Sequence, residues 1–267
     1  MKKLILIGGS LFVLWELLKD KGEDDSAKKK NRKIQFFRND AINGLGSITS
    51  NGSAILIPAV SESFYKTADL PKIKNILAKI GNAFSSEIFQ SERLTNVPAP
   101  LITAYIFAES GGKKEVVSGS GAVGLMQLIP ISASSVIHLE NKKKRLSDEE
   151  KTIIAKHIGT ERLSKILKAV NLSKITASMI TKKDLMIPEL NILIGSIFLG
   201  LLIDEHNESG KIRLDKVTLR YNKGYFFKPK GATEQETLAL AKKMSSETSA
   251  YIIKITGKNG LLEIQQT

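Results

Sequence analysis

Residues 101–130, LITAYIFAESGGKKEVVSGSGAVGLMQLIP, hold the pattern that decides the fold. An apolar helix is predicted at the start, because apolar side chains recur there at helical spacing: Leu101, Ile102, Tyr105 and Ile106. Glu109 falls in its last turn, since Gly111 and Gly112 readily end a helix. A loop rich in glycine and serine follows, and a second helix is expected to begin at Pro130.

The position of Glu109 predicts an unusual carboxyl group. The negative end of the helix dipole and the apolar neighbours both disfavour the charged form, so the pKa of Glu109 should rise. A carboxyl with a raised pKa can hold its proton near neutral pH and act as a general acid. Taken alone, however, a single glutamate at a helix end is more often a solvated surface residue.

Composition narrows the classes of protein and of site. The 267 residues are 42% hydrophobic, which is ample for a core, and cysteine is absent, which excludes disulfides and thiolate metal sites. The three histidines lie outside any cluster with the spacing of metal ligands, and neither metal nor cofactor is expected: His138, His157 and His206. The net charge of +13 predicts attraction to nucleic acid, anionic lipid or bacterial cell wall. No zinc-finger or RNA-binding signature occurs, so no specific nucleic-acid partner is expected.

The N-terminus predicts a membrane segment. Residues 4–15 carry no charge and follow two lysines, which is typical of a signal peptide or a short anchor. No cleavage site of small residues follows, so a retained anchor helix over residues 1–18, contacting membrane lipid through residues 4–18, is favoured over a buried helix. Its length is marginal, because a full span needs about 20 apolar residues. The expected location is therefore the membrane.

The charges that flank this segment suggest a second location. Lysine and arginine are far more numerous after the apolar run than before it, and the positive-inside rule would keep the rest of the chain in the compartment of synthesis. This arrangement suits a protein stored at a membrane and delivered later, as in a virus particle, which is the alternative location.

The rest of the chain predicts a mainly α protein. A charged linker is expected at residues 19–34, and an irregular region with room for one short strand at residues 35–70. Helical patterns then run over residues 71–267, with a helical insertion at about residues 139–187. Pro188 opens the most apolar helix, which is expected at the centre of the core. The sequence leaves the oligomeric state open.

Several short motifs follow one another in a fixed order: Glu109-Ser110, Ser118, Gly124-Leu125-Met126-Gln127, Asn191-Ile192 and Tyr221-Asn222-x-Gly224. This order and spacing resemble the soluble lytic transglycosylase family, which comprises lysozyme-like enzymes that cleave peptidoglycan. The resemblance covers roughly residues 71–267 and implies a lysozyme-like helical domain with peptidoglycan glycan strands as its substrate.

The resemblance also implies roles for individual residues. Glu109 corresponds to the catalytic acid of the family, and three residues correspond to groups that support it: Ser110, Ser118 and Tyr221. The tyrosine of the Tyr-Asn-x-Gly motif is expected to bring its hydroxyl to the catalytic carboxyl. The residues expected to contact substrate are Gly124, Leu125, Met126, Gln127, Asn222 and Glu247. The last of these belongs to a Glu-Thr-x-x-Tyr pattern that ends at Tyr251 and is expected to pack near the cleft.

The implied mechanism uses one carboxyl group. Glu109 would protonate the oxygen between N-acetylmuramic acid and N-acetylglucosamine, and would then accept the proton of the muramoyl 6-hydroxyl as a 1,6-anhydro ring forms. Ordinary glycosidases need two carboxyls, and the only other acid between Glu109 and Gln127 is Glu115, in a lysine-rich, surface-like context. Goose-type lysozymes share a similar pattern but hydrolyse the bond, which keeps hydrolysis as the near alternative.

A rival from another class is a non-catalytic, membrane-anchored basic protein that binds cell wall or nucleic acid.

Two departures from the family pattern bear on substrate contacts. Arg220 stands where alanine usually precedes the Tyr-Asn pair, and Ile129 stands where methionine is common. Neither departure removes a group that the chemistry needs.

Overall fold

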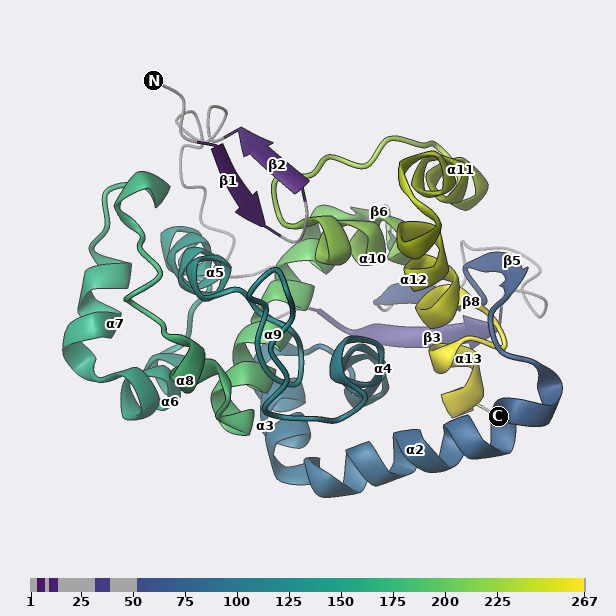
Figure 1. The fold of residues 1–267 in the computed structure, drawn as a ribbon, viewed down its shortest axis with the longest axis horizontal. Coiled ribbons are helices and arrows are strands. Elements are labelled where there is room, and N and C mark those ends of the chain that lie inside the picture. The colour runs from purple at the N-terminus through teal and green to yellow at the C-terminus, as the bar shows by residue number, and fades with distance from the viewer. Residues whose placement is uncertain (1–3, 8–9, 14–31, 39–51, 267) are drawn as a thin grey trace.

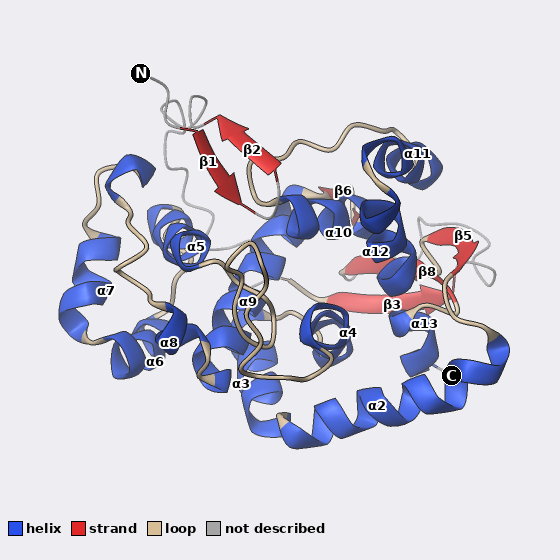
Figure 2. Cartoon of the chain, in the orientation of Figure 1, coloured by secondary structure: helices blue, strands red, loops and turns tan. Residues whose placement is uncertain are grey.

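A computed structural model describes residues 4–7, 10–13, 32–38 and 52–266 of the chain. The described part is mainly helical, as expected (Figure 2). Its α-helices are α2 (Leu70–Ala83), α3 (Ser85–Thr95), α4 (Ala99–Ser110), α5 (Pro130–Lys142), α6 (Asp148–Ile158), α7 (Thr160–Leu167), α8 (Lys182–Leu185), α9 (Pro188–Glu205), α10 (Leu214–Lys223), α11 (Glu234–Met244), α12 (Ser246–Thr256) and α13 (Leu261–Gln266). Short 3₁₀ turns occupy Thr67–Asp69 and Leu172–Lys174.

Helix α9 is the central element of the fold. Every residue from Leu190 to Ile203 is buried, and the helix packs against α3, α5, α6, α8 and α10 (Figure 1). Pro188 lies in the first turn, where its missing N–H leaves no hydrogen bond unmade. A helix that is apolar on all sides must be surrounded by protein, so the expectation of a central core helix is confirmed.

Helix α4 carries the first half of the decisive stretch and is almost as deeply placed. Its residues from Leu101 to Ile106 are buried, and it packs against α2, α3, α12 and α13. The helix ends at Gly111, whose φ of 62° is left-handed and is readily adopted by glycine. The predicted helix end is therefore confirmed, with Glu109 in its last turn.

The region expected to be irregular, residues 35–70, instead contributes strands to the fold. β3 (Ile34–Arg38) and β4 (Ser53–Ile57) form a four-stranded sheet with β7 (Lys211–Ile212) and β6 (Asn207–Glu208), in the order β3-β4-β7-β6. β5 (Val60–Ser63) pairs with β8 (Gly257–Lys258). The side chains of Ile55 and Ile57 belong to the main hydrophobic core. The packed domain therefore begins before the boundary expected at residue 71, because partners far along the chain complete these strands.

The expected anchor helix over residues 1–18 is wrong for the residues that the structure describes. β1 (Leu4–Ile7) and β2 (Ser10–Val13) pair antiparallel, with Leu4 opposite Val13. Two glycines within the apolar run weaken a helix. Within the described ranges, none of the helices has the length and apolar character needed to cross a membrane. The remainder of this segment, and residues 19–31 of the expected linker, lie outside the described residues.

The last part of that linker enters the domain. Arg32 is only 7% exposed, and its guanidinium bonds Asp204 at 2.6 Å and the carbonyl oxygens of Thr95 and Gly200. Arg145 donates to the same Asp204 carboxylate at 2.7 Å. A buried guanidinium needs such partners, since an unpaired charge in the interior is costly. The solvated linker that was expected up to residue 34 therefore ends before Arg32.

A helical insertion is expected at about residues 139–187; in the structure α5 continues to Lys142, and residues 143–187 form a helical segment between α5 and α9. Helices α6, α7 and α8 lie at one end of the molecule, and α11, α12 and α13 lie toward the other (Figure 1). Ser147 and Glu150 form the predicted capping box at the start of α6. That this segment is an insertion relative to the family stays a prediction.

Candidate active site

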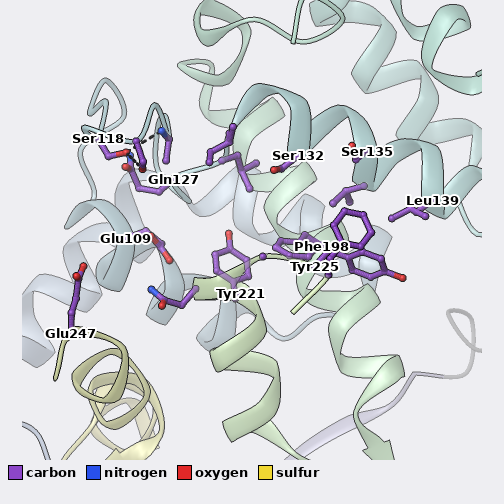
Figure 3. A pocket seen from close by; sticks show the side chains of 18 residues that line it. Glu109, Ser118, Gln127, Ser132, Ser135, Leu139, Phe198, Tyr221, Tyr225 and Glu247 are labelled. Atoms are coloured by element: carbon purple, nitrogen blue, oxygen red, sulfur yellow. Dashed lines mark hydrogen bonds between the residues drawn. The ribbon is translucent and has the colours of Figure 1, made fainter. Parts of the chain in front are cut away.

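A cavity of about 230 Å³ opens beside the end of α4 (Figure 3). Its walls come from α4, the loop over residues 111–129, α5, α9, α10, the segment after α10, and the first turn of α12. Six of the predicted site residues line it: Glu109, Ser118, Gln127, Tyr221, Asn222 and Glu247. The fold thus brings together side chains that are far apart in the sequence: Glu109 and Glu247 are separated by 138 positions.

Glu109 has the properties predicted for a general acid. Its side chain is partly buried, and loss of water around the carboxyl raises its pKa to about 7. A hydrogen bond from Tyr251 and the positive charge of Lys254 oppose this rise without cancelling it. The carboxyl can therefore exist in both protonation states near neutral pH.

The phenol that reaches Glu109 belongs to Tyr251 and not to Tyr221. On α12, the hydroxyl of Tyr251 donates a hydrogen bond to Oε1 of Glu109. The hydroxyl of Tyr221 instead donates to the carbonyl oxygen of Met126 at 2.9 Å. The expectation of a bond from Tyr221 to Glu109 is thus wrong in this structure, because the spacing of a motif does not determine where its side chain points. Burial raises the pKa of both tyrosines, so both remain protonated donors.

Tyr221 serves the site as a packed wall. Its ring lies 4.8 Å from the ring of Tyr105 in an edge-on arrangement and 5.0 Å from the ring of Phe198. Such contacts fix the plane of an aromatic ring. Tyr221 therefore holds the carbonyl of Met126, and with it the loop that borders the cavity.

Lys254 is a second group from α12 that the sequence motifs did not indicate. It follows Tyr251 by three positions, so the two side chains share a helix face. Its ammonium donates to the carbonyl oxygen of Ala108 at 3.1 Å and lies 5.4 Å from the ring centre of Phe107. Burial lowers the pKa of Lys254, while the nearby Glu109 opposes that shift. A cation at this position caps the exposed carbonyls at the end of α4.

A buried asparagine of α9 holds the loop beside the cavity. Asn191 is fully buried; its Nδ2 donates to the carbonyls of Val123 at 2.9 Å and Leu185 at 2.8 Å, and its Oδ1 accepts from the N–H of Met126 at 2.8 Å. Gly124 permits this approach, because a Cβ there would lie 2.5 Å from Nδ2 of Asn191, and its φ of 79° is left-handed. Asn191 therefore ties the loop to α9, the buried central helix of the fold.

The four residues of the Gly-Leu-Met-Gln motif have different surroundings. Leu125 and Met126 have no exposed surface, and together with Gly124 they lie outside the cavity lining. Their expected contact with substrate is not seen, since they anchor the loop in the core. Gln127 does line the cavity, and its Nε2 donates to the carbonyls of Val116 at 3.1 Å and Gly124 at 2.9 Å.

Neither of the expected supporting serines bonds Glu109. The hydroxyl of Ser110 donates to the carbonyl of Ile106 at 3.1 Å and accepts from the N–H of Gly112 at 3.2 Å, which closes the end of α4. Ser118 lines the cavity, but its hydroxyl accepts from the N–H of Ala122 at 3.0 Å. Both serines shape the loop that surrounds the acid.

Two carboxyl groups of the described residues line the cavity, Glu109 and Glu247. Glu247 lies in the first turn of α12 and is exposed. Glu115 is also exposed, pairs with Lys114 at 4.0 Å and is not part of the lining. Glu109 is thus the less exposed of the two carboxyls in the cavity.

Residues 86–180 match the family described as Transglycosylase SLT domain. The matched segment runs from α3 past α7 and includes Glu109 and the loop that Asn191 holds. Tyr221, Glu247 and Tyr251 come from helices beyond it. The match is to a family of enzymes, which argues against the non-catalytic alternative. Over residues 86–180 the chain is therefore similar to the transglycosylase SLT family, and its activity is that of a lytic transglycosylase, an enzyme that cleaves peptidoglycan.

Proposed function

We propose that the enzyme cleaves the β-1,4 bond between N-acetylmuramic acid and N-acetylglucosamine and leaves 1,6-anhydromuramoyl ends. The observation that carries the proposal is the partly buried carboxyl of Glu109 in the cavity, whose pKa of about 7 lets it act first as an acid and then as a base. The net charge of +13 supports an anionic, carbohydrate-rich wall as the substrate.

The reaction can be written with one protein group that moves a proton. Protonated Glu109 gives its proton to the glycosidic oxygen, and the bond from that oxygen to the anomeric carbon breaks. The muramoyl 6-hydroxyl attacks the anomeric carbon, and the Glu109 carboxylate takes its proton. The product is an internal acetal, no water is consumed, and Glu109 returns to its protonated form. Tyr251 favours the carboxylate through its hydrogen bond, while burial favours the acid.

Glu109→Gln, with Glu247→Gln as a matched control, tests the proposal. Both changes remove one carboxyl from the same cavity and keep the size of the side chain. Purified peptidoglycan is digested with each variant, and the released muropeptides are identified by mass spectrometry. We expect Glu109→Gln to release none, and Glu247→Gln to keep releasing anhydro ends. Undiminished release by a folded Glu109→Gln variant would refute the proposal.

The same products separate transglycosylation from hydrolysis. A lysozyme-like reaction places water on the anomeric carbon and needs a second group to activate it, and Glu247 is the carboxyl available in the cavity. Hydrated ends from the unmodified enzyme, lost in Glu247→Gln, would reassign the reaction to hydrolysis.

We further propose that the enzyme acts at the bacterial cell envelope, in local wall opening, with residues 4–18 in contact with membrane lipid. Delivery from a virus particle during phage entry is the alternative. The uncharged run over residues 4–15, followed by many basic residues, supports membrane contact. Deleting residues 1–18 should release the protein from sedimented membranes, while Phe12→Glu should weaken the association. A deletion variant that still sediments with membranes would contradict this proposal.

A further inference from the structure

The cavity continues well beyond Glu109. In Figure 3, Tyr221 stands between the two glutamates on one side and Phe198, Tyr225 and Leu139 on the other. The far end is formed by α5, by Phe198 of α9, and by Tyr225 and Phe226, which follow the end of α10. This end carries aromatic and aliphatic groups, with the hydroxyls of Ser132 and Ser135 beside them.

Tyr225 is held at both of its ends. Nε of Arg220 donates to the carbonyl oxygen of Tyr225 at 3.1 Å, and the guanidinium lies 4.9 Å from the centre of the tyrosine ring. Nη1 of Arg220 donates to Oε2 of Glu205 at 2.5 Å, and the hydroxyl of Tyr225 donates to Oε1 of the same carboxylate at 2.7 Å. Arg220 and Glu205 therefore clamp the backbone and the phenol of Tyr225 together.

The guanidinium at the centre of the clamp is buried, whereas Glu205 reaches the surface. Arg220 is 7% exposed, and Lys143, the residue after α5, adds a further ion pair to Glu205 at 3.4 Å. Burial alone would raise the pKa of Glu205, but Arg220 and the hydrogen bond from Tyr225 bring it below its usual value. The neighbouring His206 has its pKa lowered to about 4 by burial and by Arg220, so it adds no charge near neutral pH. A guanidinium suits this place because it is planar, stacks on rings and donates in several directions.

We propose that Tyr225 and Phe226 form a binding subsite for a sugar ring of the glycan strand remote from the cleaved bond, and that Arg220 is the residue that positions them. A pyranose ring has an apolar face of C–H groups and polar groups at its edge. The far end of the cavity offers an aromatic wall for that face and serine hydroxyls for the edge. The proposal rests on the proposed function, since it takes the glycan strand as the ligand. Arg220, the departure from the family pattern, thereby acquires a role in substrate contact.

A binding experiment tests the subsite without any reaction. N-acetylglucosamine oligomers of two to six sugars are titrated calorimetrically into the Glu109→Gln protein, with and without Tyr225→Ala. Affinity should increase with length until the subsite is filled, and Tyr225→Ala should lower affinity for the longer oligomers by about three- to tenfold. Equal weakening for the shortest and the longest oligomers would overturn the subsite.

Kinetics on glycan strands test the role of Arg220. Arg220→Met should raise KM for long strands and leave kcat and the pH profile unchanged. Arg220→Lys should lower KM only part of the way back, because an ammonium group cannot both stack on the Tyr225 ring and donate to the Tyr225 carbonyl. Tyr225→Phe keeps the aromatic ring and loses the hydrogen bond to Glu205, so its KM should lie between those of the two Arg220 variants. Phe89→Ala removes an aromatic side chain that is 61% exposed on α3 and serves as the control. A fall in kcat at constant KM would refute the positioning role.

The two proposals can fail separately. Absence of anhydro products from the unmodified enzyme would refute the proposed reaction while leaving the binding experiment valid. Normal anhydro products with length-independent binding would refute the subsite alone. Thermal unfolding of each variant shows whether it is folded. A loss of affinity that is seen only with peptide-bearing strands would assign the aromatic wall of Tyr225 and Phe226 to the peptide, and would overturn the sugar subsite.

Discussion

Replacing Tyr251 by phenylalanine should move the alkaline limb of the activity profile upward. The Tyr251 hydroxyl donates to Oε1 of Glu109, and this bond favours the carboxylate over the acid. Without it, the pKa of Glu109 rises above its value of about 7. Because the proposed reaction begins with protonated Glu109, activity should then persist to higher pH.

The size of the shift follows from the strength of the bond. A hydrogen bond to a charged group contributes about 1.5–3 kcal/mol, and one pKa unit corresponds to about 1.4 kcal/mol, so the limb should move by about 1–2 units. The assay is the initial rate of release of soluble muropeptides from peptidoglycan between pH 4 and 10, at substrate concentrations well below KM. In that range the profile reports the pKa of the free enzyme.

Tyr221→Phe provides the matched control. It also removes a buried phenolic hydroxyl, but one that donates to the Met126 carbonyl rather than to Glu109. We expect a lower rate, because the loop is less well held, with the limb unmoved. If Tyr221→Phe shifts the limb and Tyr251→Phe does not, the assignment of the phenols in the site is wrong.

Three further changes probe the same region. Glu109→Gln should stabilise the fold at high pH, because raising the pKa of the Glu109 carboxyl from 4.5 to about 7 costs the folded state roughly 3 kcal/mol above pH 7. This cost is absent below pH 4.5 and grows between pH 4.5 and 7. Urea unfolding should therefore show a higher free energy of unfolding for the variant at pH 8.5 but not at pH 4. Asn191→Ala should destabilise the protein by about 2–4 kcal/mol, because the Met126 N–H and other buried groups lose their partner; unchanged urea midpoints would contradict this. Lys254→Met should move the alkaline limb upward and Lys254→Arg should restore it, since a positive charge favours the carboxylate; a downward shift would contradict the assignment.

Local features of the fold could be predicted from the sequence. The end of α4 at Gly111, the capping box of Ser147 with Glu150 and the burial of the helix opened by Pro188 all depend on neighbours within a few positions. Periodicity and capping residues report such short-range interactions directly. The raised pKa of Glu109 was predicted for a related reason, since its helix end and its apolar neighbours are visible in the chain.

Features that depend on distant partners could not be predicted. The strand Ser53–Ile57 pairs with Lys211, and Arg32 bonds Asp204, separations that no local pattern reports. The bond from Tyr251 to Glu109 spans 142 positions. The Glu-Thr-x-x-Tyr pattern placed Tyr251 near the cleft, and only the packing of α12 on α4 shows that its hydroxyl meets the acid.

Sequence motifs also combine residues that do different work. In the Gly-Leu-Met-Gln motif, Gln127 lines the cavity, whereas Leu125 and Met126 fill the core and Gly124 makes room for Asn191. A motif reports that these residues occur together but does not distinguish packing from contact with substrate. Burial separates the two roles and requires the folded chain.

The pKa and surroundings of Glu109, the proposed catalytic acid, depend on parts of the chain outside the segment that matches the family. A chain that ended at residue 180 would keep Glu109 and the loop that follows it, yet it would lack Asn191, which holds that loop, and Tyr251, which bonds the acid. Burial by the rest of the fold raises the pKa of Glu109, and two groups of α12, Tyr251 and Lys254, bring it part of the way back. A single group that acts first as an acid and then as a base needs a pKa near the working pH. The balance between burial, which raises the pKa of Glu109, and the two α12 groups, which lower it, is therefore a condition of the proposed mechanism. Helix α12 therefore belongs to the active site as much as the helix that carries the glutamate.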